Sequence, residues 1–197
     1  MRSTAWFLSL LVLVWPEIAF AHAPPWGGPE NFYSGFLHPL YVPTHALAIG
    51  AVGVLAGQQA ARWQWMAVAA YVIGLVLGFA AMVAAFAPVV MGEILLVAAA
   101  AAGALTALAR PLPELLGAAL ALVTGVAVAL DSPPSVISLS EANVILIGTF
   151  CGGAILLMAV VKFSAALRRD WQRIALRIVG SWIAASAMMV LALRLAR

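Results

Sequence analysis

Three histidines are the side chains in this 197-residue sequence whose type and spacing best suit metal chemistry. His22, His38 and His45 all lie in the first quarter of the chain, and no histidine follows them. Neutral imidazole is a common ligand for nickel, cobalt, copper and zinc. On a straight helix, seven residues at 1.5 Å each would separate the side chains of His38 and His45 by about 10 Å along the axis. A single ion could not easily bind both histidines across that distance.

Two prolines beside these histidines change the expected geometry. Pro39 and Pro43 each lack a backbone donor, and Pro43 predicts a kink or a delayed helix start. A broken start would fold His38 back toward His45 and so allow a shared metal site. The alternative is that each histidine lies at the membrane interface and bonds to a backbone carbonyl.

Other candidate ligands are more scattered. Glu93, in the segment APVVMGEILL, lies at the start of a predicted helix, either as a metal ligand near the histidines or as a carboxylate stabilised by the helix dipole. Asp131 and Glu141 bracket the segment DSPPSVISLSE, where solvation or helix capping explains them. Cys151 and the methionines offer soft ligands to copper, but their lack of paired spacing favours ordinary packing.

The elements that position these side chains are predicted to be transmembrane helices. Hydrophobic residues make up 65% of the chain and charged residues 9%, whereas a soluble domain is about half apolar and a quarter charged. The long apolar runs are continuous rather than alternating, which indicates an all-α bundle in the lipid bilayer rather than a barrel. Gly74 with Gly78, and Gly148 with Gly152, predict close helix contacts.

The chain divides into three predicted parts. Residues 1–21 have the order of a cleaved signal peptide, with Arg2, an apolar stretch and a final Ala-Phe-Ala, so the mature protein would begin at His22. Residues 22–36 form an external segment rich in proline and glycine, and residues 37–197 form the transmembrane domain. Its six helices are predicted at 37–58, 64–87, 90–109, 113–131, 142–163 and 173–195.

Charge distribution predicts the orientation of these helices. If His22 is external, alternation places most positively charged loops in the cytoplasm, as the positive-inside rule requires. The cytoplasmic residues would be Arg62, Arg110, Lys162, Arg168, Arg169 and Arg173. Arg194 and Arg197, near an external C-terminus, are exceptions to that rule. We therefore expect a bacterial inner-membrane protein with both mature termini outside.

The stretch HPLYVPTHALAIGAVGVLAG resembles the opening helix of the HupE/UreJ family of hydrogenase and urease accessory membrane proteins. The family pattern is His-Pro, two variable residues, Gly, a variable residue and Asp-His, of which His38, Pro39 and His45 match. The resemblance implies a nickel or cobalt permease, or a component that delivers metal to an enzyme maturation system. It also implies a six-helix layout and a glutamate similar to Glu93.

This sequence departs from the family pattern in two ways. Val42 replaces the glycine, and Thr44 replaces the aspartate that adjoins the second histidine. The family's second histidine-rich motif is absent from the corresponding segment GVAVALDSPPS. Two alternatives therefore remain, namely a non-transporting membrane scaffold and a copper-handling protein that uses His22 with its free amine.

Several classes of function are not supported by the sequence. No nucleophilic triad, nucleotide-binding loop or dinucleotide fingerprint is present, so an enzyme is not expected. The positive charges lie at helix ends and in loops rather than in one basic patch, which is not typical of nucleic-acid binding. We expect no tightly bound cofactor, only a transported metal ion.

Overall fold

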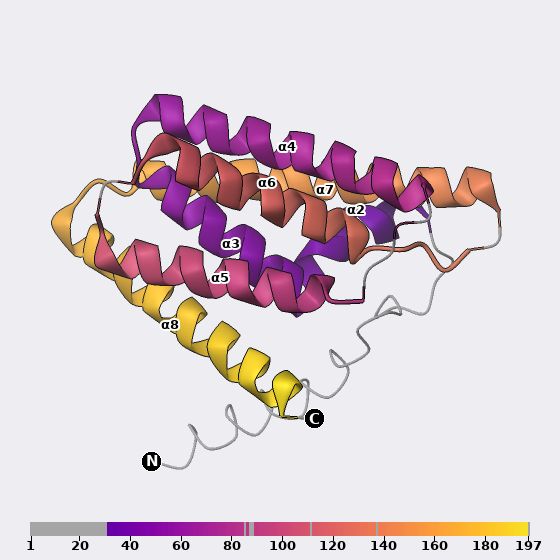
Figure 1. Ribbon diagram of the computed structural model, residues 1–197. Coiled ribbons are helices and arrows are strands. Elements are labelled where there is room, and N and C mark those ends of the chain that lie inside the picture. The colour runs from indigo at the N-terminus through magenta and orange to yellow at the C-terminus, as the bar shows by residue number, and fades with distance from the viewer. Residues whose placement is uncertain (1–30, 85, 87–88, 111, 137, 197) are drawn as a thin grey trace, which may run out of the picture.

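The computed structural model describes residues 31–84, 86, 89–110, 112–136 and 138–196. Within these residues the chain forms seven α-helices and no β-strand, which confirms the predicted all-α class (Figure 1). The helices are α2 (Phe32–Tyr41), α3 (Pro43–Gly57), α4 (Ala61–Val83), α5 (Met91–Leu108), α6 (Glu114–Leu130), α7 (Leu139–Ala166) and α8 (Asp170–Leu195). The predicted signal peptide and His22 lie outside the described residues.

The lengths of these helices suit a membrane protein. Helices α4, α5, α7 and α8 are long and apolar enough to cross a bilayer. Helices α2 and α3 pass the same test as a pair, and α6 is apolar but only 17 residues long. A helix perpendicular to the membrane needs about 20 residues to span it. The predicted count of six full spans is therefore not confirmed.

The first predicted helix, 37–58, is observed as two helices with a break immediately before Pro43, where the sequence predicts a kink. It begins earlier, because the Asn31 side chain accepts hydrogen bonds from the backbone N–H groups of Tyr33 and Ser34 and so caps α2. It then breaks at Val42, whose backbone is extended, and α3 starts at Pro43. Proline disfavours a helical residue before it and has no N–H to continue the helix. The two halves meet at 70°.

The remaining helix ends differ from prediction by a few residues. Helices α7 and α8 begin at Leu139 and Asp170, each three residues earlier than expected. Glu141 and Asp170 lie in the first turns of these helices, where the positive end of the helix dipole stabilises a carboxylate. Polar residues that resemble a loop in a hydropathy pattern therefore belong to the helices.

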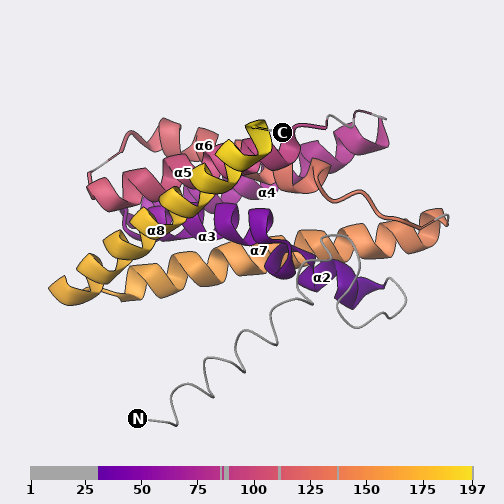
Figure 2. The ribbon, with the colours of Figure 1, turned by 90° about the horizontal axis from the view of Figure 1, so that it is seen from below.

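Glycines determine how closely the helices pack. A Cβ on Gly152 of α7 would collide with the Phe36 backbone of α2, and Gly148 lies equally close to α2. Gly74 and Gly78 of α4 face the α6 backbone in the same way. The close contacts predicted from both glycine pairs are confirmed, and α2 lies along α7 as a result (Figure 2).

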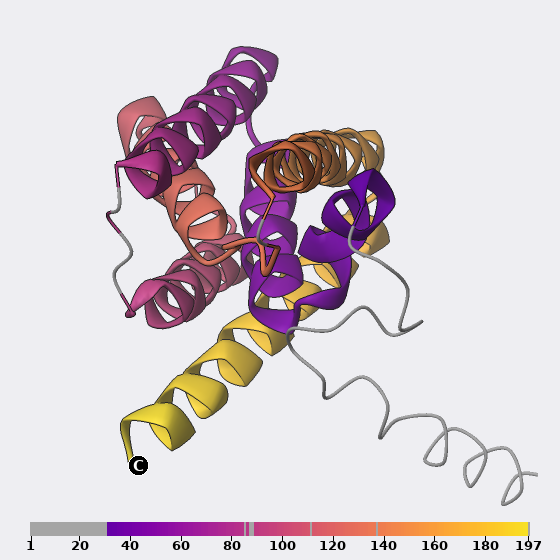
Figure 3. The ribbon, with the colours of Figure 1, turned by 90° about the vertical axis from the view of Figure 1, so that its right-hand side faces the viewer.

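Helix α3 lies in the middle of the bundle, with the other helices around it (Figure 3). Most of its residues are buried, including Thr44 and His45 in its first turn. Helix α8 packs mainly on α5 and leaves its outer side exposed (Figure 2). A polar side chain at the start of α3 is thus held inside the protein and must find its partners on other helices.

Candidate functional site

The break between α2 and α3 brings two of the predicted ligands together. The ring centroids of His38 and His45 lie 5.2 Å apart, with the ring planes at 62°. His38 belongs to the last turn of α2, and His45 is the third residue of α3. The prediction that a proline-broken helix folds the first histidine back toward the second is confirmed.

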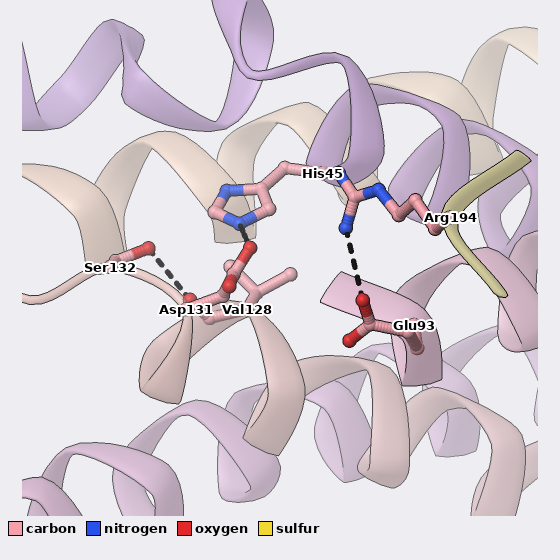
Figure 4. A network of polar contacts seen from close by, with 6 residues as sticks. All are labelled: His45, Glu93, Val128, Asp131, Ser132 and Arg194. Atoms are coloured by element: carbon pink, nitrogen blue, oxygen red, sulfur yellow. Dashed lines mark hydrogen bonds and ion pairs between the residues drawn. The ribbon is translucent and has the colours of Figure 1, made fainter. Parts of the chain in front are cut away.

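Asp131 joins this pair from another helix. Its Oδ2 lies 3.0 Å from Nε2 of His45, whose side chain is fully buried, whereas the Asp131 side chain is 31% exposed (Figure 4). Asp131 directly follows the last residue of α6, so the negative end of that helix dipole points to the same place. The expectation that solvation or capping alone explains Asp131 is therefore wrong.

The carboxylate leaves the second nitrogen of His45 available. Nδ1 is buried and has no hydrogen-bond partner among the described residues. If Nε2 carries the proton and donates it to Asp131, Nδ1 presents a lone pair. In metal sites, a carboxylate commonly orients a ligand histidine through the nitrogen that does not bind the metal. His45 and Asp131 have the chemistry of such a pair.

Two cavities meet at these residues, and both are lined by His38 and Asp131. One has a volume of about 330 Å³ and also borders Ser34, Tyr41 and Ser132. The other, of about 350 Å³, is bordered by the break itself and by the end of α8. Its other lining residues are Val42, Pro43, Thr44, Leu47, Leu96, Val190 and Arg194. We call the cavity-lining side chains His38, Asp131 and Arg194, together with the bonded partners His45 and Glu93, the polar mouth.

Glu93 lies in the polar mouth but does not contact the histidines in the way we expected. Its Oε1 is 3.5 Å from Nη1 of Arg194, which comes from the last turn of α8 (Figure 4). Glu93 also lies in the first turn of α5, where the helix dipole favours a carboxylate. The second of the two roles expected for Glu93 fits this geometry, with an ion pair added.

The polar mouth is not a closed metal site. Within the part of the chain that the structure describes, no group of three His, Cys, Asp or Glu side chains is close enough to hold a metal ion. Cys151 is a half-buried free thiol. Any cation here would be held by two imidazoles and one carboxylate only after the side chains move closer together.

Two residues of the mouth were missed by sequence reasoning, although each carried a signal. Asp131 ends a helix on the same predicted side as the histidines, within the segment that lacks the second histidine motif. Arg194 is a cation at the end of the molecule predicted to be external, where the positive-inside rule expects few cations. Each signal indicates that the side chain interacts with another residue of the protein, but neither signal identifies that residue.

Comparison with known proteins identifies the family of this chain. A search of curated proteins and a search of solved structures give no match. A family model described as HupE / UreJ protein matches residues 10–190, which is most of the chain. With its membrane helices and its His-Pro segment, the chain belongs to the HupE/UreJ family.

Proposed function

We propose that this protein is an inner-membrane permease, or a metal-delivery component, for divalent nickel or cobalt. The observation that carries the proposal is the approach of the two imidazoles, His38 and His45, with Asp131 bonded to the second. Imidazole nitrogens bind these metals well. A carboxylate that accepts a hydrogen bond from the other ring nitrogen makes the histidine a stronger metal ligand.

Asp131 supplies the carboxylate that the family pattern contains and that this sequence lacks at position 44. Thr44 replaces the aspartate that adjoins the second histidine, yet a carboxylate from the end of α6 contacts the same imidazole. A negative charge beside a buried histidine lowers the electrostatic cost of bringing in a cation. This supports an altered metal site over the loss of one.

An open arrangement suits transport better than storage. The cavities on either side of His38 and Asp131 leave room for an ion to arrive and depart. A conduction site must bind its ion strongly enough to admit it and weakly enough to release it. Two imidazoles and one carboxylate, without a full set of ligands, meet that requirement.

The same incompleteness is the observation that favours a non-transporting scaffold. Among the described residues, no three His, Cys, Asp or Glu side chains lie close enough together to hold a metal ion, and Nε2 of His45 is already bonded to Asp131. In that case the His45–Asp131 pair would be a structural contact between α3 and α6. Metal uptake distinguishes the two functions.

The test is metal accumulation in cells that express the full-length protein. Replacing His45 with alanine or Asp131 with asparagine should weaken nickel or cobalt uptake about tenfold or more, while membrane levels of the protein remain unchanged. His38→Ala should act in the same direction. Glu141→Gln is the matched control, because Glu141 is an exposed acid at the start of α7.

Three outcomes are distinguishable. Uptake that depends on the two histidines and Asp131, but not on Glu141, supports the permease. Copper accumulation in place of nickel and cobalt would support copper handling. If all three site variants leave metal accumulation at the wild-type level, the permease proposal is wrong and the scaffold is favoured.

A further inference from the structure

Arg194 places a permanent positive charge in the polar mouth. Its side chain lines the 350 Å³ cavity together with His38 and Asp131, and its Nη1 lies 3.5 Å from Oε1 of Glu93. A guanidinium group cannot be deprotonated in a protein. Any metal ion that reaches this cavity therefore meets a cation that already interacts with the acids.

The surroundings of Gly92 place the guanidinium of Arg194 near a second acid, Asp131. A Cβ on Gly92 would lie 2.6 Å from Nη1 of Arg194 and 3.9 Å from Oδ1 of Asp131. The guanidinium therefore occupies space that any larger residue at position 92 would take. The Cβ position of Gly92 is thus close to both Arg194 and Asp131, and Figure 4 shows Arg194 directed toward Glu93, the next residue along the chain.

The ion pair between Arg194 and Glu93 is weak enough to break. The side chains of Arg194 and Glu93 are 44% and 33% exposed, and their ion pair is not a short bidentate one. Partly exposed pairs of this kind contribute little to stability because solvent screens them. The long arginine side chain can therefore swing into the open cavity while α8 stays in place.

We propose that Arg194 is a tethered competing cation that sets the metal selectivity of the polar mouth, an inference that rests on the proposed function. Hard ions such as magnesium prefer oxygen ligands and gain only the carboxylates, for which Arg194 competes. Nickel and cobalt also gain the imidazoles, which Arg194 does not occupy. The arginine thus penalises magnesium more heavily than nickel or cobalt.

This role also accounts for the position of the charge. Arg194 lies at the end of the molecule that the positive-inside rule leaves free of cations. A cation in an external mouth repels incoming metal and would be a disadvantage without a compensating use. Selection between metal ions is such a use.

The experiment compares nickel uptake at increasing concentrations, with and without excess magnesium, in five variants of the full-length protein. Arg194→Gln should lower the half-saturating nickel concentration at least about fivefold and make uptake more sensitive to magnesium. Gly92→Ala should shift both values in the same direction, because the new methyl group displaces the guanidinium. Arg194→Lys keeps the charge and should shift them less.

Arg173→Gln is the matched control, since it removes the same charge from the opposite end of α8. It should leave both values unchanged. Half-saturation and magnesium sensitivity that stay at wild-type values in Arg194→Gln and Gly92→Ala would overturn the inference, as would weaker nickel binding.

His45→Ala, measured in parallel, distinguishes failure of this inference from failure of the proposed function. Loss of uptake in His45→Ala with no effect of Arg194→Gln rejects only the inference, whereas unchanged uptake in His45→Ala rejects the proposed function and the inference with it.

Discussion

The two ends of the helix bundle carry opposite chemistry. The polar mouth combines imidazoles and carboxylates with one arginine, and prolines interrupt the helices there. At the other end, cavities of about 270 and 660 Å³ are lined mainly by basic and amide side chains. The basic residues there are Arg110, Lys162, Arg168, Arg173 and Arg177. The first end offers imidazole and carboxylate ligands to a divalent cation, whereas the second offers positive charge.

The break within the apolar helix pair α2 and α3 lies at the mouth. Val42 interrupts the pair α2 and α3 and borders a cavity, together with Pro43. Within a membrane, non-helical backbone is tolerated only where it is buried in protein or lines a water-filled space. At the basic end, by contrast, α3 and α4 are joined by a short turn at Gln58–Ala60. The break between α2 and α3 thus coincides with the place where the two histidines are brought together.

Orientation is the largest effect to test, because the outcome is all or none. A reporter fused after Arg169, at the basic end, should be cytoplasmic, and one fused after Ser135, near the mouth, should be external. Enzymatic reporters that are active on only one side of the membrane measure this directly. Finding both reporters on one side would break the comparison, since the two ends would no longer face different compartments.

The packing of α2 on α7 should have the next largest effect. Gly152→Ala forces a methyl group into the Phe36 backbone and should lower the free energy of unfolding in detergent by about 1–3 kcal/mol. The substitution should also reduce metal uptake, because His38 belongs to α2 and would move with it. The measurement is denaturant unfolding followed by circular dichroism.

Gly50→Ala is the control for that experiment. Position 50 lies inside α3, and a Cβ there meets nothing within 4 Å. Because alanine favours helix over glycine, this change should raise the free energy of unfolding by up to about 1 kcal/mol. Equal effects of the two substitutions would contradict the packing described for α2 and α7.

The smallest predicted effect concerns the departure from the family pattern. Thr44 is buried beside His45 and borders the cavity that contains Asp131. Thr44→Asp should tighten nickel or cobalt binding roughly threefold to tenfold, by adding a carboxylate to the mouth. Isothermal calorimetry on the purified protein checks this, with Thr44→Asn as a control of similar shape. Tighter binding in both variants would show that charge is not the cause.

Much of the fold was predictable because its determinants are local. Continuous apolar runs indicated helices, and the predicted ends fall within a few residues of those observed, apart from the start of the first helix. Pro43 predicted the break that brings His38 to His45, and the glycine pairs predicted the closest helix contacts. The earlier start at Phe32 was missed because Asn31 and Ser34 resemble a loop until their capping bonds are formed.

The partners of the mouth were not predictable in the same way. His45 and Asp131 are separated by 86 positions, and Glu93 and Arg194 belong to α5 and α8, which pack side by side. Hydropathy and proline spacing are local features that depend on one or two turns of sequence. They determined that helices form and where the helices break. Only the tertiary structure decided which helix ends meet, because side-chain packing and the glycine contacts set the distances between helices.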